Sequence, residues 1–327
     1  SDQTNASATT NGLRVVDGTA WAHERCTAFG VPEAYLPTVV DSVGVVGHAT
    51  ALAGSPPIAA ILGDQQASLI GQSCVKPGRA KITFGTGGML DLCTDTGTPS
   101  EASRHPAGTY PVPLWSQNGT ITWGVEAIML SAGTNIEWLR DDLGLISTSA
   151  ESHDVASMCD DTDGVVYVPA LLGLGTPRWD YGARGTLLGI TRGTGRPHVV
   201  RAVLEGIAHR GADLLEAARC DSGVDIHTVR IDGGMSANPT FAQALADAAN
   251  CPIEVAPVAD STTIGAAFMA GLGVGLFEGL DDLDRLWNPA HVVEPRDPAT
   301  HAQRRERWAD ALDRAAGWHA DLSALEF

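Results

Sequence analysis

The sequence predicts an α/β fold, in which helices cover the faces of a β-sheet. Short apolar runs of strand length alternate with longer segments of helical periodicity from Ile58 to Asn250. Three of the runs meet a glycine-centred turn, as strands do where a sheet ends. Of the 327 residues, 44% are hydrophobic and 18% are charged, a balance typical of a folded chain long enough for two domains.

The first half of the chain contains mainly short elements. Ala80 to Phe84 alternates in polarity like a strand, and the glycine-rich turn after it indicates a hairpin. Apolar Ile128, Ile136 and Leu139 indicate one face of a helix. The expected elements are a polar loop (1–7), a helix (21–29), a strand (58–62), a helix (67–72), two hairpin strands (80–84 and 89–93) and a helix (124–141).

The second half predicts longer helices between strands. Pro197 suits the first turn of a helix, and the apolar residues from Val199 to Leu215 largely fit a helical stripe. Ser261 or Thr262 can cap the apolar helix that follows, which is too short and glycine-rich to span a membrane. The expected elements are a strand (165–168), a helix (197–219), a strand (228–231), a helix (239–250), a strand (252–256), a buried helix (264–277) and a helical tail (301–327).

The net charge of −18 argues against two classes of partner. Nucleic acids and anionic membranes bind basic surfaces, and only two lysines occur, Lys76 and Lys81. The six cysteines have no paired spacing and the histidines form no metal-binding motif, which favours free thiols in a reducing compartment. Because the opening residues also lack a basic, hydrophobic leader, we expect a cytoplasmic protein.

Gly85-Thr86-Gly87-Gly88 is the first of three turns that could carry chemistry. Glycines let the backbone approach a ligand and turn its N–H groups outward, which suits phosphate oxygens, and the Thr86 hydroxyl adds a donor. The alternative is that this segment is simply the tip of a hairpin.

Asp232 to Asn238 forms the second turn, between a predicted strand and a predicted helix. Its backbone N–H groups would lie at the positive end of that helix, where anions bind well. Asn238 could bond a ribose or a base edge, or it could merely cap the helix.

Gly63-Asp64-Gln65-Gln66 is the third turn, between an apolar strand and a helix. This is where α/β folds place ligands, and a carboxylate there can accept the proton of a hydroxyl that attacks a phosphoryl group. Asp64 could instead be an N-cap or a hinge residue. Neither G-x-x-x-x-G-K-S/T nor G-x-G-x-x-G occurs, so a phosphate site would be built from separate turns, as in the two-lobed actin-like ATPases.

Several motifs resemble those of the glycerol kinases in the FGGY family of carbohydrate kinases, and they follow one another along the chain in the order that the family has. GDQQASLIGQSCVKPGRAKITFGTG (63–87) is similar to the stretch with the catalytic Asp and the second phosphate turn. GTLLGITRGTGRPHVVRAVLE (185–205) resembles the C-terminal FGGY signature, and IDGGMSAN (231–238) the adenosine-binding turn. SAGTNIEWLRD (131–141) and TTIGAAFMAGLGVG (262–275) are similar too, so the resemblance covers most of the chain.

The resemblance implies two ribonuclease-H-like domains around a cleft and ATP-dependent phosphorylation of a polyol hydroxyl, with glycerol as the first candidate. Asp64 corresponds to the catalytic base, which also faces Mg²⁺, and Gln65 to a substrate contact. The positions implied to contact the nucleotide are Gly85, Thr86, Gly133, Glu137, Gly234 and Asn238.

Three departures from the family pattern bear on specificity. Met89 replaces the usual Phe against the carbon chain of the substrate, which leaves an apolar but more pliable substrate contact. Glu137 replaces the usual Gln near the nucleotide and adds a negative charge. The segment between Gly47 and Ile58 lacks the Gly-Gly-x-x-Arg element for a sugar bisphosphate inhibitor, so we expect no such regulation.

No stretch of the chain resembles the first phosphate turn of the family or its Arg, Glu and Tyr contacts to the polyol. We therefore expect residues 1–72 to be the C-terminal part of an incomplete first domain and residues 73–327 to be the second domain. Alone, this chain is expected to have little or no activity. The family also makes a homo-oligomer, a dimer or tetramer, the expected assembly.

Two other functions are compatible with the same motifs. The first keeps the kinase fold and changes the substrate to another polyol or a ketose, such as erythritol or xylulose, and Met89 is the reason to consider it. The second is a nucleotide-binding or assembly module of the actin-like superfamily without catalysis, in which Asp64 would have no role in turnover.

Overall fold

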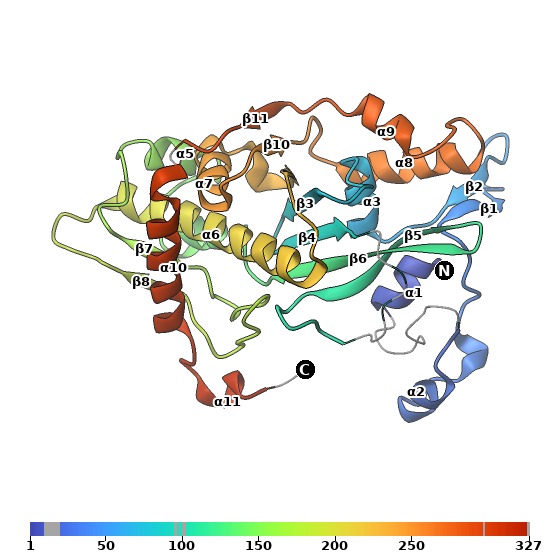
Figure 1. The fold of residues 1–327 in the computed structure, drawn as a ribbon, viewed down its shortest axis with the longest axis horizontal. Helices are drawn as coiled ribbons and strands as arrows, with labels where there is room; N and C mark the ends of the chain where they lie inside the picture. Colours follow the sequence, from blue (N-terminus) through green and yellow to red (C-terminus); the bar gives the residue numbers. More distant parts are fainter. Residues whose placement is uncertain (10–19, 95–96, 98, 100–102, 297, 326–327) are drawn as a thin grey trace.

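The structure is a computed structural model that describes residues 1–9, 20–94, 97, 99, 103–296 and 298–325. Its centre is a mixed seven-stranded sheet with the strand order β11-β10-β9-β3-β4-β6-β5 (Figure 1). The strands are β3 (Arg79–Phe84), β4 (Gly88–Cys93), β5 (Tyr110–Gln117), β6 (Thr120–Met129), β9 (Thr228–Asp232), β10 (Ile253–Val255) and β11 (His291–Val293). The pairs β3–β9 and β9–β10 are parallel and the others antiparallel. With helices on both of its faces, this sheet confirms the predicted α/β fold.

The two faces of the sheet differ in chemistry, because successive residues of a strand point to opposite sides. One face is apolar and packs against α6 (Arg196–Ser222) and α7 (Pro239–Ala249), and together they form the main core. Phe84 of β3, for example, lies edge-on to Phe241 of α7 at 4.7 Å between ring centroids. The other face carries polar Lys81 and Thr83, which contact α3 (Asp64–Gly71).

Helix α3 is locked to α8 (Ser261–Gly273) at very short range. A Cβ atom at Gly71 would lie 1.9 Å from the carbonyl oxygen of Ser261, and one at Gly265 would lie 1.8 Å from that of Ala67. Both positions therefore require glycine. A second core forms around this contact, and it includes Leu69, Ile70, Leu114, Phe268 and Met269.

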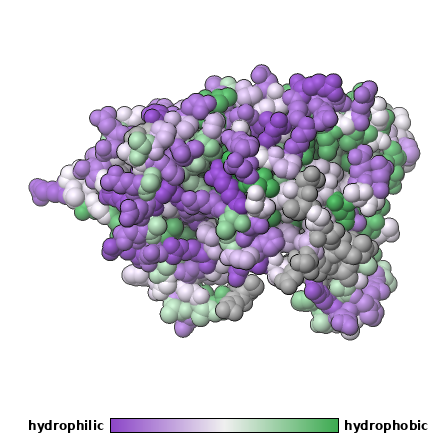
Figure 2. Space-filling model, viewed as in Figure 1, coloured by the Kyte–Doolittle hydropathy of each residue, from purple (hydrophilic) through white to green (hydrophobic). Residues whose placement is uncertain are grey.

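The remaining elements surround these two cores. They are α1 (Gln3–Thr9), α2 (His23–Ala28), η1 (Glu33–Tyr35), β1 (Val43–His48), β2 (Pro57–Ala60), α4 (Thr134–Glu137), η2 (Trp138–Asp142), α5 (Glu151–Ala156), β7 (Val166–Val168), β8 (Thr186–Leu188), η3 (Gly234–Ala237), α9 (Asp281–Leu286), η4 (Pro298–Thr300), α10 (His301–Ala315) and α11 (Ala320–Ser323). Across the described ranges, no helix is long and apolar enough to cross a membrane. Apolar side chains gather on the surface at the end formed by β1, β2 and α8, at the right of Figure 2, where Val45, Leu52, Ile58 and Leu276 are exposed.

Most predicted elements lie within a few residues of the observed ones, but the helix predicted over residues 124–141 is wrong. Residues 120–129 form strand β6, paired on both sides with β4 and β5. Val125, Ala127 and Met129 alternate into the core, and this cross-strand burial outweighs the weak helical pattern of the segment. A helix begins only at Thr134.

Three smaller predictions are also corrected. The polar opening is helix α1 rather than a loop, because the Asp2 carboxylate accepts the backbone N–H groups of Thr4 and Asn5 at 3.0 and 3.1 Å. Asp260, not Ser261 or Thr262, caps α8, and its Oδ1 accepts the Thr263 N–H at 3.0 Å. Helix α8 is not wholly buried, since 46% of Ile264 is exposed. Residues 326–327 of the predicted helical tail lie outside the described residues.

Candidate functional site

One cavity of about 540 Å³ gathers residues that lie far apart in the sequence. It lies between the turn after β3, the start of α4, helix α5 and the η3–α7 turn. Its volume is in the range of small-molecule pockets, and Phe84, Ile136, Leu204 and Met235 make part of its wall apolar. All six residues that the sequence assigns to the nucleotide line it: Gly85, Thr86, Gly133, Glu137, Gly234 and Asn238.

The turn at Gly85 and the turn at Gly133 are fastened together by backbone hydrogen bonds. The Gly133 N–H donates to the Gly85 carbonyl and the Ala132 N–H to the Thr86 carbonyl, both at 2.8 Å. A Cβ atom at Gly133 would lie 2.5 Å from the Gly85 oxygen, so this approach requires glycine. Nothing in the local sequence around Gly133 signals this, because the requirement arises from a partner 48 residues away.

The turn after β9 approaches the same point from the other side. Gly233 has φ +86°, and a Cβ atom there would lie 2.4 Å from the Phe84 carbonyl oxygen. Gly85 and Gly234, by contrast, have nothing within 4 Å of the place where a Cβ atom would stand. Their backbone therefore borders open space in the cavity, where a ligand could come close to it.

Asn238 is held by protein partners at both ends of its amide. Its Oδ1 accepts the Phe241 N–H at 3.1 Å and so caps α7, while its Nδ2 donates to Ser152 Oγ of α5 at 2.9 Å. Asn238 therefore caps α7. The side chain also joins two walls of the cavity.

The electrostatics of the cavity are unusual for an anion site. Its described lining contains two carboxylates, Glu137 and Asp154, and no Lys or Arg. His153 lines it as well, with its Nδ1 at 2.8 Å from Thr240 Oγ1. Phosphate oxygens would have to be bound by backbone N–H groups, the Thr86 hydroxyl and a metal ion.

Asp64, Gln65 and Met89 lie outside this cavity, on the α3 side of the sheet. Asp64 is the first residue of α3, whereas Gly63 takes the N-cap position, so the N-cap alternative for Asp64 is wrong. The Asp64 carboxylate is exposed, and its Oδ1 accepts the Gln65 N–H at 2.8 Å. Met89 is paired with Thr83 across the strands and therefore shares the polar face of the sheet.

The sequence interpretation missed a buried polar network beneath α3. Lys81 Nζ lies 2.7 Å from Asp91 Oδ2 and donates to Gln65 Oε1 at 2.6 Å. Glu126 follows Asp91 across the next strand pair, and burial together with the Asp91 carboxylate raises the pKa of Glu126 to about 7. The available signal was the presence of charged residues inside strands that are otherwise apolar.

The described residues contain no cluster of three or more His, Cys, Asp or Glu side chains that could hold a metal ion. Asp64 can still offer a carboxylate oxygen to a cation, because its side chain is exposed and its one hydrogen-bonded oxygen receives a single N–H. Mg²⁺ is commonly bound by one or two carboxylates together with water and substrate phosphates. The Asp64 carboxylate therefore fits a Mg²⁺ ion whose other ligands are water and substrate phosphates.

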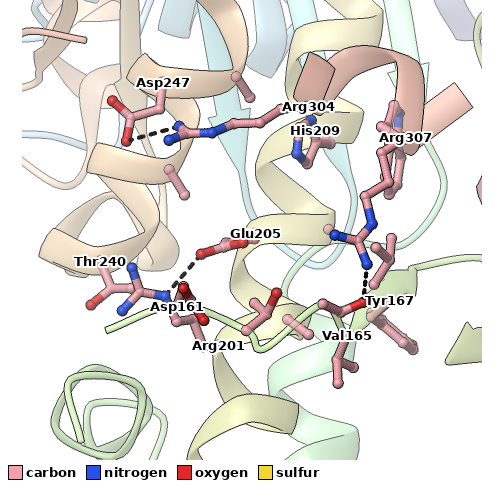
Figure 3. Close-up of a pocket in the computed structure, with 18 of the residues that line it drawn as sticks. Asp161, Val165, Tyr167, Arg201, Glu205, His209, Thr240, Asp247, Arg304 and Arg307 are labelled. Atoms are coloured by element: carbon pink, nitrogen blue, oxygen red, sulfur yellow. Dashed lines mark hydrogen bonds and ion pairs between the residues drawn. The ribbon is translucent and has the colours of Figure 1, made fainter. Parts of the chain in front are cut away.

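A second cavity, of about 490 Å³, lies among α6, α7 and α10 (Figure 3). It is rich in charges, but they are largely paired: Arg201 Nε lies 2.9 Å from Glu205 Oε1, and Arg307 Nη2 donates to the Gly164 carbonyl at 2.5 Å. Burial and the nearby Arg305 lower the pKa of His209 to about 3, so this imidazole is neutral. None of the catalytic, substrate or nucleotide positions that the sequence suggests lines this cavity.

Comparisons with known proteins show the family of this chain. Residues 80–274 match the C-terminal domain of the FGGY family of carbohydrate kinases. A glycerol kinase of Rhodopirellula baltica is 41% identical over 320 residues, which are 97% of this chain and 58% of the relative. One of Coxiella burnetii is 39% identical over 316 residues, 96% of this chain and 62% of the relative. The chain thus spans about three fifths of the length of these curated relatives.

Solved structures share the fold. The crystal structure of Plasmodium falciparum glycerol kinase with ADP superposes with a TM-score of 0.85 at 30% identity, covering 100% of this chain and 64% of that one. Gluconate kinase from Lactobacillus acidophilus superposes with a TM-score of 0.83 at 21% identity, covering 99% of this chain and 66% of that one, and shows the fold alone.

Proposed function

Because this chain belongs to the FGGY family of carbohydrate kinases, we propose that it supplies the nucleotide site and the catalytic base of an ATP-dependent glycerol kinase. The observation that carries the proposal is the convergence of the three predicted nucleotide segments, at Gly85, Gly133 and Gly234, on one cavity. The β3 strand that ends at this cavity also contacts α3, which carries Asp64. Relatives named glycerol kinases support glycerol as the acceptor.

In this proposal ATP lies in the cavity, and its phosphates accept hydrogen bonds from the Gly85 turn and the Thr86 hydroxyl. Asp64 accepts the proton of the attacking hydroxyl, while Gln65 and Met89 contact the polyol. The product is glycerol 3-phosphate. Mg²⁺, when bound, neutralises phosphate charge that the carboxylates of the cavity would otherwise oppose.

We propose the same division of the chain as the sequence suggests. Residues 1–72 belong to the first of two domains that face a cleft, and residues 73–327 form the second. The enzyme is cytoplasmic and assembles as a homo-oligomer. Size-exclusion chromatography of the complete protein with light scattering tests the assembly, and a monomer at micromolar concentration would contradict it.

Two measurements test the proposal. Calorimetric titration should show saturable binding of MgADP to the chain, and Asp64→Asn should leave most of that binding in place because Asp64 lies outside the cavity. In assays of ATP-dependent phosphorylation of glycerol by the complete protein, Asp64→Asn should lower the rate by several orders of magnitude, counting its metal role as well. Unchanged turnover in Asp64→Asn would favour a nucleotide-binding module in which this carboxylate has no catalytic part.

A different acceptor is the second candidate, and Met89 is the observation that favours it. Its flexible thioether side chain lies on the polar face of the sheet that also contacts α3. Phosphorylation of glycerol, erythritol and xylulose by the complete protein should be compared for wild type and Met89→Phe. A wide preference of the wild type for another polyol or a ketose would overturn glycerol as the substrate.

A further inference from the structure

Beneath α3, the sheet carries a row of charged side chains that the proposed reaction does not use. Cross-strand pairing sets Lys81 of β3 beside Asp91 of β4, and Asp91 beside Glu126 of β6. The side chains of Lys81 and Asp91 have 0% exposed surface. Charges are costly to bury, and replacing such a pair by apolar residues is often neutral or stabilising. A contribution to stability is therefore a weak explanation for the presence of the Lys81–Asp91 pair.

Lys81 has one ion-pair partner and two hydrogen-bond partners. Its Nζ lies 2.7 Å from Asp91 Oδ2, and it donates to Gln65 Oε1 at 2.6 Å and to Thr83 Oγ1 at 3.1 Å. An ammonium group has N–H donors and no acceptor, so both hydrogen bonds run from Lys81, whereas neither carboxylate oxygen of Asp91 accepts a hydrogen bond within the described residues. The Asp91 carboxylate neutralises the charge of Lys81. The hydrogen bond from Lys81 to Gln65 then connects this row of charged side chains to α3.

The ammonium group fixes which end of the Gln65 amide faces the sheet. Because Lys81 can only donate, the carbonyl oxygen Oε1 must point to it, and the opposite rotamer would set two groups of donors against each other. Gln65 is partly exposed, and within the described part of the chain its Nε2 has no hydrogen-bond partner. The amide nitrogen is thus left as a free donor on the residue that follows Asp64 in α3.

The same network reaches the nucleotide turn. Thr83 Oγ1 lies 3.2 Å from Ser68 Oγ, and Ser68 donates to Asp232 Oδ2 at 3.0 Å. Asp232 immediately precedes Gly233. One hydrogen-bonded path therefore runs from Lys81 through Thr83 and Ser68 of α3 to the loop that borders the cavity.

We propose that Lys81 is a positioning residue for the acceptor substrate, an inference that rests on the proposed function. It holds the Gln65 carbonyl so that the amide nitrogen donates a hydrogen bond to a hydroxyl oxygen of the polyol beside Asp64. A group bound at this point must accept a hydrogen bond. The site therefore favours hydroxyl or carbonyl oxygens and disfavours an ammonium group, so that 3-amino-1,2-propanediol binds in the orientation that places its amine elsewhere, or not at all.

NMR of the chain labelled with ¹⁵N-glutamine tests the contact itself. The Gln65 amide signals are assigned by their loss in Gln65→Leu. In wild type this amide should be as ordered as the backbone, and in Lys81→Met it should become mobile. Lys76→Met is the matched control, since Lys76 is half-exposed and pairs with Asp281 and Asp284 at 2.6 and 2.8 Å.

Lys81→Met alone leaves the Asp91 carboxylate buried without a partner, which could unfold the chain. The double variant Lys81→Met/Asp91→Leu removes both charges and keeps apolar volume in the same place. It should melt at or above the wild-type temperature and still release the Gln65 amide. A Gln65 amide that stays ordered in this double variant would overturn the proposal.

The functional arm is a glycerol titration of the complete protein in the presence of MgADP. Glycerol should shift the Gln65 amide signals in wild type, and the double variant should bind glycerol about tenfold more weakly, the effect of one lost hydrogen bond, with unchanged MgADP affinity. Equal glycerol affinity in wild type and double variant, or no glycerol shift of Gln65, would overturn the substrate role of Lys81. Absent MgADP binding in wild type would instead refute the proposed function, and the labelled amide would still decide the Lys81–Gln65 contact.

Discussion

Alanine substitutions at Gly133, Gly85 and Gly234 should distinguish effects on stability from effects on ligand binding, because only Gly133 is in close contact with another backbone segment. A Cβ atom at Gly133 would lie 2.5 Å from the Gly85 carbonyl oxygen. This oxygen belongs to the backbone, so it cannot move aside as the end of a flexible side chain could. At Gly85 and Gly234 a Cβ atom would meet nothing within 4 Å and would instead stand in the cavity. All three substitutions add one methyl group to a residue that lines the same cavity.

The cost of Gly133→Ala follows from this geometry. The two turns must separate by about 0.9 Å to reach an ordinary contact of 3.4 Å, which weakens the two 2.8 Å hydrogen bonds between them. Overpacking costs about 1–3 kcal/mol and a lost hydrogen bond about 1 kcal/mol. Alanine regains up to about 1 kcal/mol, because it has less conformational freedom than glycine in the unfolded chain and Gly133 has φ −59°. We expect a net loss of about 2 kcal/mol, or roughly 4 °C in Tm for a chain of this size.

Thermal unfolding and calorimetric titration with MgADP check the comparison. Gly133→Ala should lose stability and, with the turn displaced, affinity. Gly85→Ala and Gly234→Ala should melt within about 1 °C of wild type, because each places its methyl group in open space, yet bind MgADP at least tenfold more weakly. A fully stable Gly133→Ala would refute the packing argument, and wild-type affinity in Gly234→Ala would show that the ligand does not use this wall.

Two further outcomes follow from the α3 side of the sheet. Gly265→Ala should cost more than about 3 kcal/mol in chemical denaturation, since its Cβ would lie 1.8 Å from a backbone oxygen of α3, whereas Gly279→Ala, with nothing within 4 Å, should be neutral. Glu126→Gln should flatten the pH dependence of stability: burial and Asp91 raise the pKa of Glu126 from 4.5 to about 7, so the folded state keeps a proton that the unfolded chain has released. Wild-type stability should therefore fall, relative to the variant, as pH rises from about 4.5 to 7, and parallel unfolding curves over this range would contradict the assignment.

The sequence predicted the family and the fold because the turns that define them are local. Gly63-Asp64-Gln65-Gln66 and the segment from Ile231 to Asn238 can be recognised without knowledge of their partners, and membership in the FGGY family is confirmed. Long helices with a regular apolar stripe, such as α6, were also predicted nearly to their ends. Strand β6 was not, because its conformation depends on pairing with β4 and β5 rather than on its own pattern.

The backbone positions that line the candidate cavity were named from the sequence, whereas the side-chain network beneath α3 was missed. The assigned nucleotide positions meet in one cavity, but local sequence could not show why Gly133 must be glycine. Lys81, Asp91 and Glu126 form a row only when the register of three strands is known, and no short-range pattern encodes that register. Their proposed roles, like those of Asp64 and Gln65, remain predictions for the experiments above.

The position of Asp64 depends on helix α8 more than on its own neighbours. Its carboxylate accepts a hydrogen bond from the adjacent Gln65 N–H, which follows it wherever the helix end moves. The body of α3 is fixed by the Gly71 and Gly265 contacts with α8, and Thr262 Oγ1 of α8 donates to the Asp64 carbonyl at 3.4 Å. Gly265 lies about two hundred residues further along the chain. The Gly63-Asp64-Gln65-Gln66 motif can be recognised locally, but its position in the fold depends on the distant helix α8. A methyl group at Gly265 should therefore act on Asp64 as well as on stability, and impair the proposed catalysis without touching any residue of the site.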